Sequence, residues 1–192
     1  MRMFSLRHKT PLAWAHNAIL DMDALLLDHA ACERKAAAMG MSFVVKYPDR
    51  LEIIDPLIHF AREELEHFQQ VCRLLVRRGL VLDHDEPDRY VNLLHKKVRT
   101  GRDERFLDRL VVAAVIEARG TERLGLVTDV LEDPELKALY RRLTRAEDRH
   151  KDLFLDLATH YFEPAAISDR LSYFLDEEAI AIQAVPFRSA IH

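Results

Sequence analysis

The stretch REELEHF, residues 62–68, places a glutamate and a histidine three positions apart, and the same spacing recurs in RAEDRH, residues 145–150. Residues three apart on an α-helix lie on one face, so Glu64 and His67 point the same way, and so does the later pair. Each pair can hold one side of a metal ion, or it can be a charged turn at the surface. The apolar pattern around the pairs decides between these interpretations.

The composition favours an all-α protein. Only 5 of the 192 residues are glycine, which indicates helices with few tight turns rather than a sandwich or barrel. A hydrophobic fraction of 49% and a charged fraction of 31% are ordinary for a globular chain. We expect one domain over residues 1–192, with a helical bundle over about 11–162 and a C-terminal helix and tail over about 163–192.

The chain shows no targeting or disulfide pattern. Neither the N-terminal stretch nor any later one has an apolar run long enough for a signal peptide or a membrane span, so we expect a cytoplasmic protein. Cys32 and Cys72 are far apart and form no CxxC pair, which excludes a zinc ribbon or a rubredoxin module. Cys32 is expected to be a small core residue.

Apolar residues recur at helical spacing in four long stretches. The predicted helices span residues 11–41, 49–79, 103–131 and 134–161. Proline turns separate the first pair at KYPDR and the last pair at LEDPEL, and Gly79 ends the second helix. The connection between the pairs has room for a short helix near 87–99, and SDRLSYFLDEEAIAI, residues 168–182, predicts another. This order is typical of two helical hairpins joined by a crossover.

Acidic residues interrupt the apolar stripes of these helices. Glu117 follows Leu110, Ala113 and Ala114 on one stripe of the third helix, and Glu33 interrupts the first helix in the same way. Both Glu-x-x-His pairs also fall on apolar faces. Six polar residues are therefore predicted to face the core: Glu33, Glu64, His67, Glu117, Glu147 and His150.

The turns place these residues level with one another. In an antiparallel hairpin, two residues lie level when they are equally far from the turn. The midpoint of Glu33 and Glu64 falls between Pro48 and Asp49, and that of Glu117 and Glu147 falls at residue 132, beside Pro134. Both midpoints are proline turns, so each hairpin is predicted to bring its two glutamates together.

Four buried carboxylates need positive charge between them. Each would cost several kcal/mol if left uncompensated. Two divalent metals balance four carboxylates and two neutral imidazoles. One glutamate from each of two helices and Glu-x-x-His from the other two is the ligand set of ferritin-like di-iron and di-manganese proteins. In that pattern Glu64 and Glu147 bridge the metals, and the ligands alone do not choose iron over manganese.

Neighbouring residues have simpler interpretations. Glu63 lies four residues before His67, but its counterpart in the second copy is Ala146, so Glu63 is assigned to the rim. His29 precedes Glu33 by one turn and is interpreted as a core histidine or a partner of a ligand. Tyr140 is interpreted as a core residue.

Four stretches of the chain resemble the tRNA hydroxylase family that acts on isopentenylated, methylthiolated adenosine beside the anticodon. They are WAHNAILDMDALLLDHAACERKAA (14–37), AREELEHF (61–68), VIEARGTERL (115–124) and AEDRHKDLFLDLA (146–158). The likeness covers roughly residues 12–165 and includes all six ligand positions. It implies O₂-dependent hydroxylation of the isopentenyl group at a centre of two Fe ions, with electrons from an external reductase. A ferritin-like or rubrerythrin-like iron oxidase, storage or peroxide-detoxifying protein is the alternative.

Three basic clusters are candidates for contacts with the tRNA anticodon stem-loop, although a solvated helix face is the simpler interpretation of each. The cluster in the crossover is preferred, because a loop can follow phosphates. Its predicted RNA-binding residues are Lys96, Lys97, Arg99 and Arg102. The others lie at Arg73, Arg77 and Arg78 and at Arg141, Arg142 and Arg145. A monomer or small oligomer is expected, since an RNA enzyme needs an open face.

Overall fold

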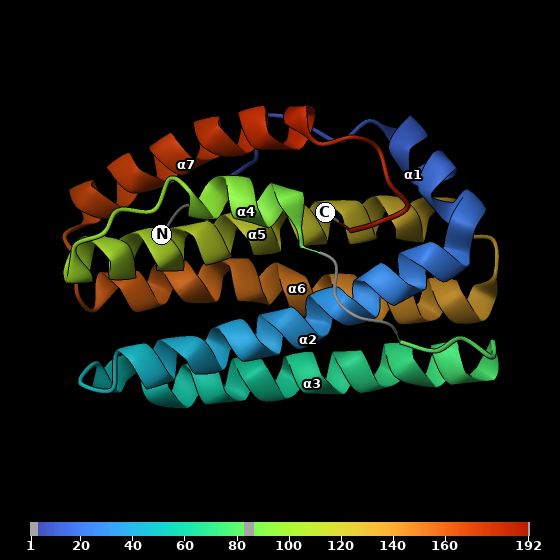
Figure 1. The fold of residues 1–192 in the computed structure, drawn as a ribbon, viewed down its shortest axis with the longest axis horizontal. Coiled ribbons are helices and arrows are strands. Elements are labelled where there is room, and N and C mark those ends of the chain that lie inside the picture. The colour runs from blue at the N-terminus through green and yellow to red at the C-terminus, as the bar shows by residue number, and fades with distance from the viewer. Residues whose placement is uncertain (1–3, 83–86, 192) are drawn as a thin grey trace. The chain divides into compact units, whose positions relative to one another are not determined.

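The computed structural model describes residues 4–82 and 87–191, and these residues form helices, turns and loops without a strand (Figure 1). The all-α prediction is therefore confirmed. The elements are α1 (Leu12–Ala18), η1 (Ile19–Asp21), α2 (Met22–Lys46), η2 (Leu51–Ile53), α3 (Ile54–Arg77), α4 (Arg89–His95), α5 (Arg102–Val130), α6 (Pro134–Thr159) and α7 (Pro164–Ala184).

The first predicted helix, residues 11–41, is wrong as one continuous element. The chain forms α1, then the 3-10 turn η1, and α2 begins only at Met22. The cause is local, because the side chain of Asp21 accepts a hydrogen bond from the backbone N–H of Ala24 and so caps α2. The crossover does contain a short helix, α4, while residues 83–86 of that connection lie outside the described residues.

The chain groups into two compact units. The α5–α6 unit comprises the described residues 4–15 and 87–187, and the α2–α3 unit comprises residues 16–82 and 188–191. The first unit is thus discontinuous in sequence, with the second inserted into it. That residues 1–192 make one domain stays a prediction.

In the α2–α3 unit, two helices form an antiparallel hairpin around the predicted turn after Lys46. A Cβ at Gly40 of α2 would lie 2.8 Å from Cδ1 of Phe60 on α3, so glycine permits this close packing. Pro56 lies in the first turn of α3, where its missing N–H has no intrahelical acceptor. Gly79, whose φ is 72°, follows α3 and terminates the helix.

Cys32 differs from its predicted place in the core of this unit. It is only half-buried, and its Sγ lies 3.7 Å from Oδ2 of Asp28. The inward side of α2 is instead occupied by Ala30, Glu33 and Ala37, which are all buried. Cys32 lies off that side because it directly precedes Glu33 on the helix.

In the α5–α6 unit, the second antiparallel hairpin turns at residues 131–133, as predicted. Asp133 caps α6 by accepting hydrogen bonds from the N–H groups of Glu135 and Leu136, and Pro134 is the first residue of the helix. Helices α4 and α7 also pack in this unit, each in contact with α5. Within the described residues, no helix is both long and apolar enough to cross a membrane.

Candidate metal centre

The α2–α3 unit contains a buried cluster of Glu33, Glu64 and His67, which we call the first half-site. All three side chains are buried. His67 Nδ1 lies 3.5 Å from Glu33 Oε2 and 4.0 Å from Glu64 Oε2. One ligand atom from each residue falls within 4.8 Å of the other two. The hairpin turn therefore brings Glu33 level with Glu64, as the midpoint argument predicts.

The α5–α6 unit contains the second half-site, made of Glu117, Glu147 and His150. These side chains are buried too, and His150 Nδ1 lies 3.2 Å from Glu147 Oε2. One ligand atom from each of the three also lies within 4.8 Å of the others. The prediction that all six residues face the core is confirmed.

The donor set of each half-site suits a divalent transition metal. Two carboxylates and a neutral imidazole carry a charge of about −2, which one M²⁺ ion balances. Oxygen and imidazole ligands together are accepted by Fe and Mn. Burial makes the uncompensated carboxylates costly, by several kcal/mol each. In each hairpin, the residues present therefore fit a metal of the kind that the sequence predicts.

A histidine lies beside the first half-site, and the sequence has no counterpart of it at the second. His29 Nε2 lies 2.7 Å from Glu33 Oε1, and both side chains are buried. A histidine in that position can fix the orientation of a ligating carboxylate. Position 113, one turn before Glu117, is alanine. Glu63 is partly exposed and pairs with His59 at 4.0 Å, in agreement with its assignment to the rim.

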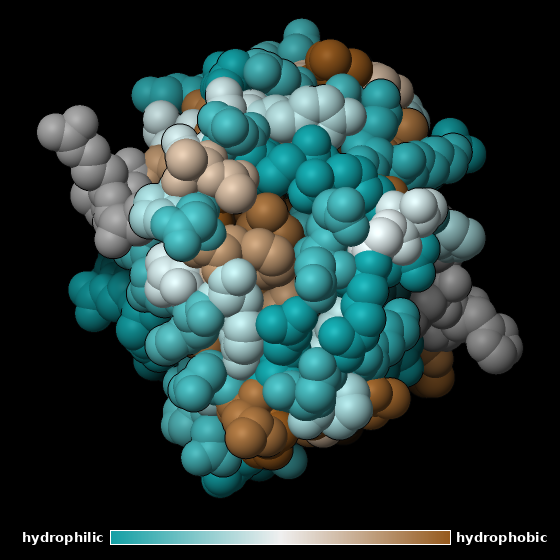
Figure 2. Space-filling model, turned by 90° about the vertical axis from the view of Figure 1, so that its left-hand side faces the viewer, coloured by the Kyte–Doolittle hydropathy of each residue, from teal (hydrophilic) through white to brown (hydrophobic). Residues whose placement is uncertain are grey.

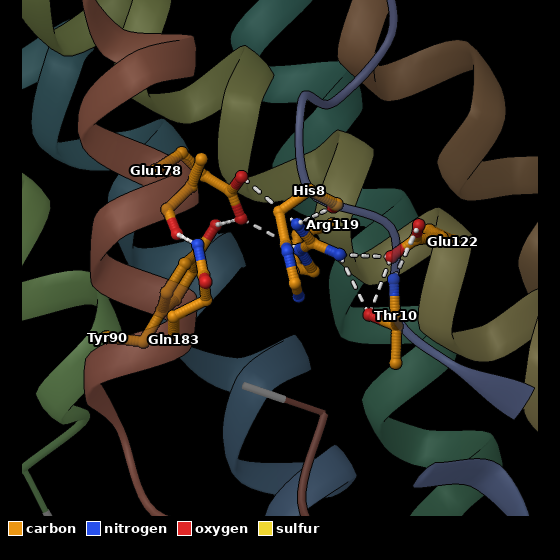
Figure 3. A network of polar contacts seen from close by, with 8 residues as sticks. His8, Thr10, Tyr90, Arg119, Glu122, Glu178 and Gln183 are labelled. Carbon is orange, nitrogen blue, oxygen red and sulfur yellow. Dashed lines mark hydrogen bonds and ion pairs between the residues drawn. The ribbon is translucent and has the colours of Figure 1, made fainter. Parts of the chain in front are cut away.

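Helix α5, which carries Glu117, also contributes to a buried ionic network that the sequence analysis did not predict (Figure 3). Arg119, two residues after Glu117 on α5, is fully buried. Its Nε and Nη2 donate to the two carboxylate oxygens of Glu178 on α7 at 2.8 and 3.0 Å. Nη1 donates to Thr10 Oγ1 at 2.8 Å and also to Glu122, and Nη2 donates to the carbonyl of His8 at 2.7 Å. One guanidinium thus joins α5 to α7 and to the N-terminal segment.

Two further residues complete this network. The hydroxyl of Tyr90 on α4 donates to Glu178 Oε1 at 3.2 Å, and burial together with that carboxylate raises the pKa of Tyr90 well above its ordinary value. The guanidinium of Arg123 lies 4.5 Å from the centroid of the Trp14 ring. Burial, reinforced by the charge of Arg119, lowers the pKa of Arg123 to about 10.

The network leaves a weak signal in the sequence. Charged residues crowd the stretch EARGTER, residues 117–123, directly after the apolar run at residues 110–116, and Arg119 and Glu122 are spaced for an ion pair. The main partner, Glu178, lies 59 residues further along the chain. The helical spacing of apolar residues gives no information about so distant a contact, so the pairing of Arg119 with Glu178 could not be predicted from the sequence.

The predicted RNA-binding residues of the crossover divide into two groups. Lys96 and Arg102 are exposed. Lys97 Nζ lies 3.1 Å from Glu177 Oε2, and Arg99 donates from Nε and Nη2 to the carboxylate of Asp108 at 3.0 and 2.8 Å. Lys97 and Arg99 therefore already neutralise carboxylates of this chain.

Asp108 holds the loop between α4 and α5 in place. It is fully buried and accepts from the backbone N–H and side chain of Arg99 and from Nε and Nη2 of Arg170. Burial raises the pKa of Asp108, but the hydrogen bonds from Arg99 and Arg170 outweigh it, so the pKa is lowered. The carboxylate stays ionised and anchors the loop to α5 and α7.

Comparisons with known proteins identify a family and relatives of this chain. The model of the family described as tRNA-(MS[2]IO[6]A)-hydroxylase (MiaE) matches residues 2–192. A Pseudomonas putida tRNA 2-(methylsulfanyl)-N(6)-isopentenyladenosine(37) hydroxylase is 41% identical over 159 residues, covering 83% of this chain and 77% of that protein. A Salmonella typhimurium protein of the same name is 29% identical over 219 residues, covering 88% and 80%.

A solved structure extends the likeness to three dimensions. It is a Synechococcus protein described as protein 43 with aldehyde deformylating oxygenase activity. The two chains are 33% identical, with a TM-score of 0.93 over 99% of this chain and 96% of the other. The predicted ferritin-like fold class is confirmed.

Proposed function

The chain belongs to the MiaE family of tRNA hydroxylases, and from this membership we propose that it is an O₂-dependent monooxygenase acting on tRNA. Its substrate is the isopentenyl group of a methylthio-isopentenyladenosine next to the anticodon. The names of the relatives favour hydroxylation over the storage and peroxide-detoxifying alternatives. The observation that carries the proposal is the pair of buried Glu, Glu and His clusters in a chain of this family.

We propose that the two half-sites together hold two iron ions. The ligands are Glu33, Glu64, His67, Glu117, Glu147 and His150. The support is the matching composition of the two clusters and the nearly constant offset between the hairpins, which is 84 residues from Glu33 to Glu117 and 83 from Glu64 to Glu147. Two such ions, when bound, supply the activation of O₂.

The chain itself orients and shields the site. Ala30 and Ala37 lie beside Glu33 on α2, and Ala113 and Ala114 precede Glu117 on α5; all four are buried. Such small apolar side chains leave space beside the ligands and exclude water, which a reactive site requires. The two electrons that a monooxygenase consumes are proposed to come from a separate reductase, since the sequence contains no flavin, haem or iron–sulfur motif.

The test is a reconstituted reaction. Protein loaded with Fe(II) receives tRNA carrying methylthio-isopentenyladenosine, a chemical reductant and ¹⁸O₂, and the nucleosides are then analysed by mass spectrometry. We expect the modified nucleoside to gain one ¹⁸O atom with the wild type and none with Glu147→Ala. An iron-loaded wild type that leaves the nucleoside unchanged would refute the proposal. Sizing chromatography checks the accompanying expectation of a monomer or small oligomer, because storage would require a large closed shell.

A further inference from the structure

The basic residues of this chain differ in whether their charge is already balanced. In the loop between α4 and α5, Lys97 pairs with Glu177, and Arg99 shares Asp108 with Arg170. Arg102 begins α5 immediately before Asp103 and Glu104. The face that carries this loop is largely hydrophilic, so exposure alone does not distinguish a binding residue there (Figure 2). Much of the loop's positive charge is neutralised internally.

Helix α6 presents the opposite situation. Arg141, Arg142 and Arg145 are exposed on one side of the helix. Among the described residues, no carboxylate lies within ion-pairing distance of these three. The side chain of Arg142 donates to a backbone oxygen, the carbonyl of Ala138, at 3.4 Å. The nearby Asp148 is paired with Lys151. The positive charge of these three arginines, which we call the α6 arginine row, is therefore uncompensated among the residues that the structure describes.

The spacing of the row suits a phosphate backbone. Arg141 and Arg145 are four residues apart, which places them about 6 Å apart along the helix axis and on one side of it. A guanidinium can grip a phosphate with two parallel hydrogen bonds, which a lysine cannot do. Glu147 and His150 are buried on the other side of α6, so the row lies away from the ligand candidates of that helix.

We infer that the α6 arginine row is the main phosphate-binding surface for the tRNA substrate, and that Lys97 and Arg99 of the crossover chiefly fix the loop. The inference rests on the proposed function for the identity of the polyanion. It gives the acidic chain, with a net charge of −4, a local surface that attracts RNA.

The test compares three variants with the same change in net charge. The first replaces Arg141, Arg142 and Arg145 with glutamine. The second replaces Lys96, Lys97 and Arg102 with glutamine. The control replaces Lys9, Lys46 and Arg62, which are exposed and far apart in the sequence, with glutamine. Binding of an unmodified anticodon stem-loop RNA is measured by fluorescence anisotropy over a range of KCl concentrations, and circular dichroism and iron content verify the fold of each variant.

We expect the α6 variant to flatten the slope of log affinity against log salt by about 2 to 3, since each lost phosphate contact removes roughly 0.7 to 0.9. Between about 50 and 200 mM salt, this amounts to roughly 20- to 40-fold less salt-induced weakening. The loop and control variants should each change the slope by less than about 1. A larger effect of the loop variant, or equal effects of all three, would overturn the inference.

The same experiment separates this inference from the proposed function, because stem-loop binding requires neither the modified base nor turnover. If the wild type hydroxylates tRNA and the α6 variant binds RNA as the wild type does, the function stands and the inference fails. If the α6 variant loses its salt dependence as expected but the wild type never hydroxylates tRNA, the surface stands and the proposed reaction fails.

Discussion

The two helical hairpins carry the same ligand types but are supported differently. In the α2–α3 hairpin, Glu33 has a local histidine partner one turn away, His29, at 2.7 Å. In the α5–α6 hairpin, the helix that carries Glu117 is instead fixed by Arg119, whose main partner Glu178 lies on another helix. One hairpin orients a ligand from within the same helix, and the other orients the whole helix from outside.

This difference separates two tasks that a metal site imposes on its scaffold. A ligand must have the correct chemical type, and its carboxylate must be held in the correct direction. The two hairpins have the same ligand types but hold their carboxylates in place by different contacts. The substitutions below test two points. The hairpins should contribute equally to metal binding, and they should differ in the contacts that hold their ligands in place.

The largest expected effect is loss of metal from either hairpin. We expect His67→Ala and His150→Ala each to lower bound iron from about two per chain to below one, because all six residues are proposed to hold the two ions. Elemental analysis of protein purified from iron-rich medium measures this. Iron that is reduced by one substitution and unaffected by the other would show that the hairpins do not contribute equally.

The second change removes the support of the α5–α6 hairpin. Arg119→Met leaves the buried Glu178 carboxylate without its bidentate partner, and we expect it to lower the free energy of unfolding by about 3 to 5 kcal/mol. The double variant Arg119→Met with Glu178→Leu should recover much of this loss, since it removes both buried charges. Urea denaturation provides the measurement.

A control for that change exists in the other hairpin. The guanidinium of Arg34 on α2 lies 5.8 Å from the centroid of the Phe68 ring. Because this contact is only partly buried, Arg34→Met should cost about 1 kcal/mol or less. If it costs as much as Arg119→Met, the two hairpins do not differ in their dependence on arginine.

The third change removes the local support of Glu33. His29→Ala should weaken iron binding by about 10- to 100-fold, as measured by competition with a chelator, which is the usual effect of losing a residue that orients a ligand. His29→Gln should retain more iron, because its amide can still donate to Glu33. The free energy of unfolding of the iron-free protein serves as the control. Equal iron loss from all three proteins would show that His29 only fills space.

The smallest effect is a dependence on pH that arises from Asp108. Its folded pKa is lowered, so its contribution is fully present above the ordinary value of 3.8 and is lost as the pH falls through the folded pKa. We expect Asp108→Asn to cost about 1 kcal/mol near pH 7 and progressively less below pH 4. Urea unfolding of both proteins from pH 7 to pH 3 measures the difference. A constant difference across that range would contradict the assignment.

Much of the fold and the six ligand candidates could be predicted because their signals are periodic and local. Glu117 stands out in the sequence because it interrupts an apolar stripe, and the proline turn after α5 indicates that it lies level with Glu147. The break before α2 was missed because one capping aspartate, Asp21, outweighs a continuous apolar pattern. Arg119 was missed because its partners outside α5 are separated from it by 59 to 111 residues and share no period with it.

The same separation has a consequence for the order in which a nascent chain can fold. A ribosome completes α5 before α7, so Arg119 emerges before Glu178 has been translated. Both helices of the α2–α3 hairpin are translated before α5, so this hairpin can close earlier. The contact between the Arg119 guanidinium and Glu178 must therefore wait for α7, whereas His8 and Thr10 are already present. During that interval the Arg119 side chain is a charged group without its main partner. The protein is therefore incompletely folded at this stage of biosynthesis, and a chaperone would bind it then.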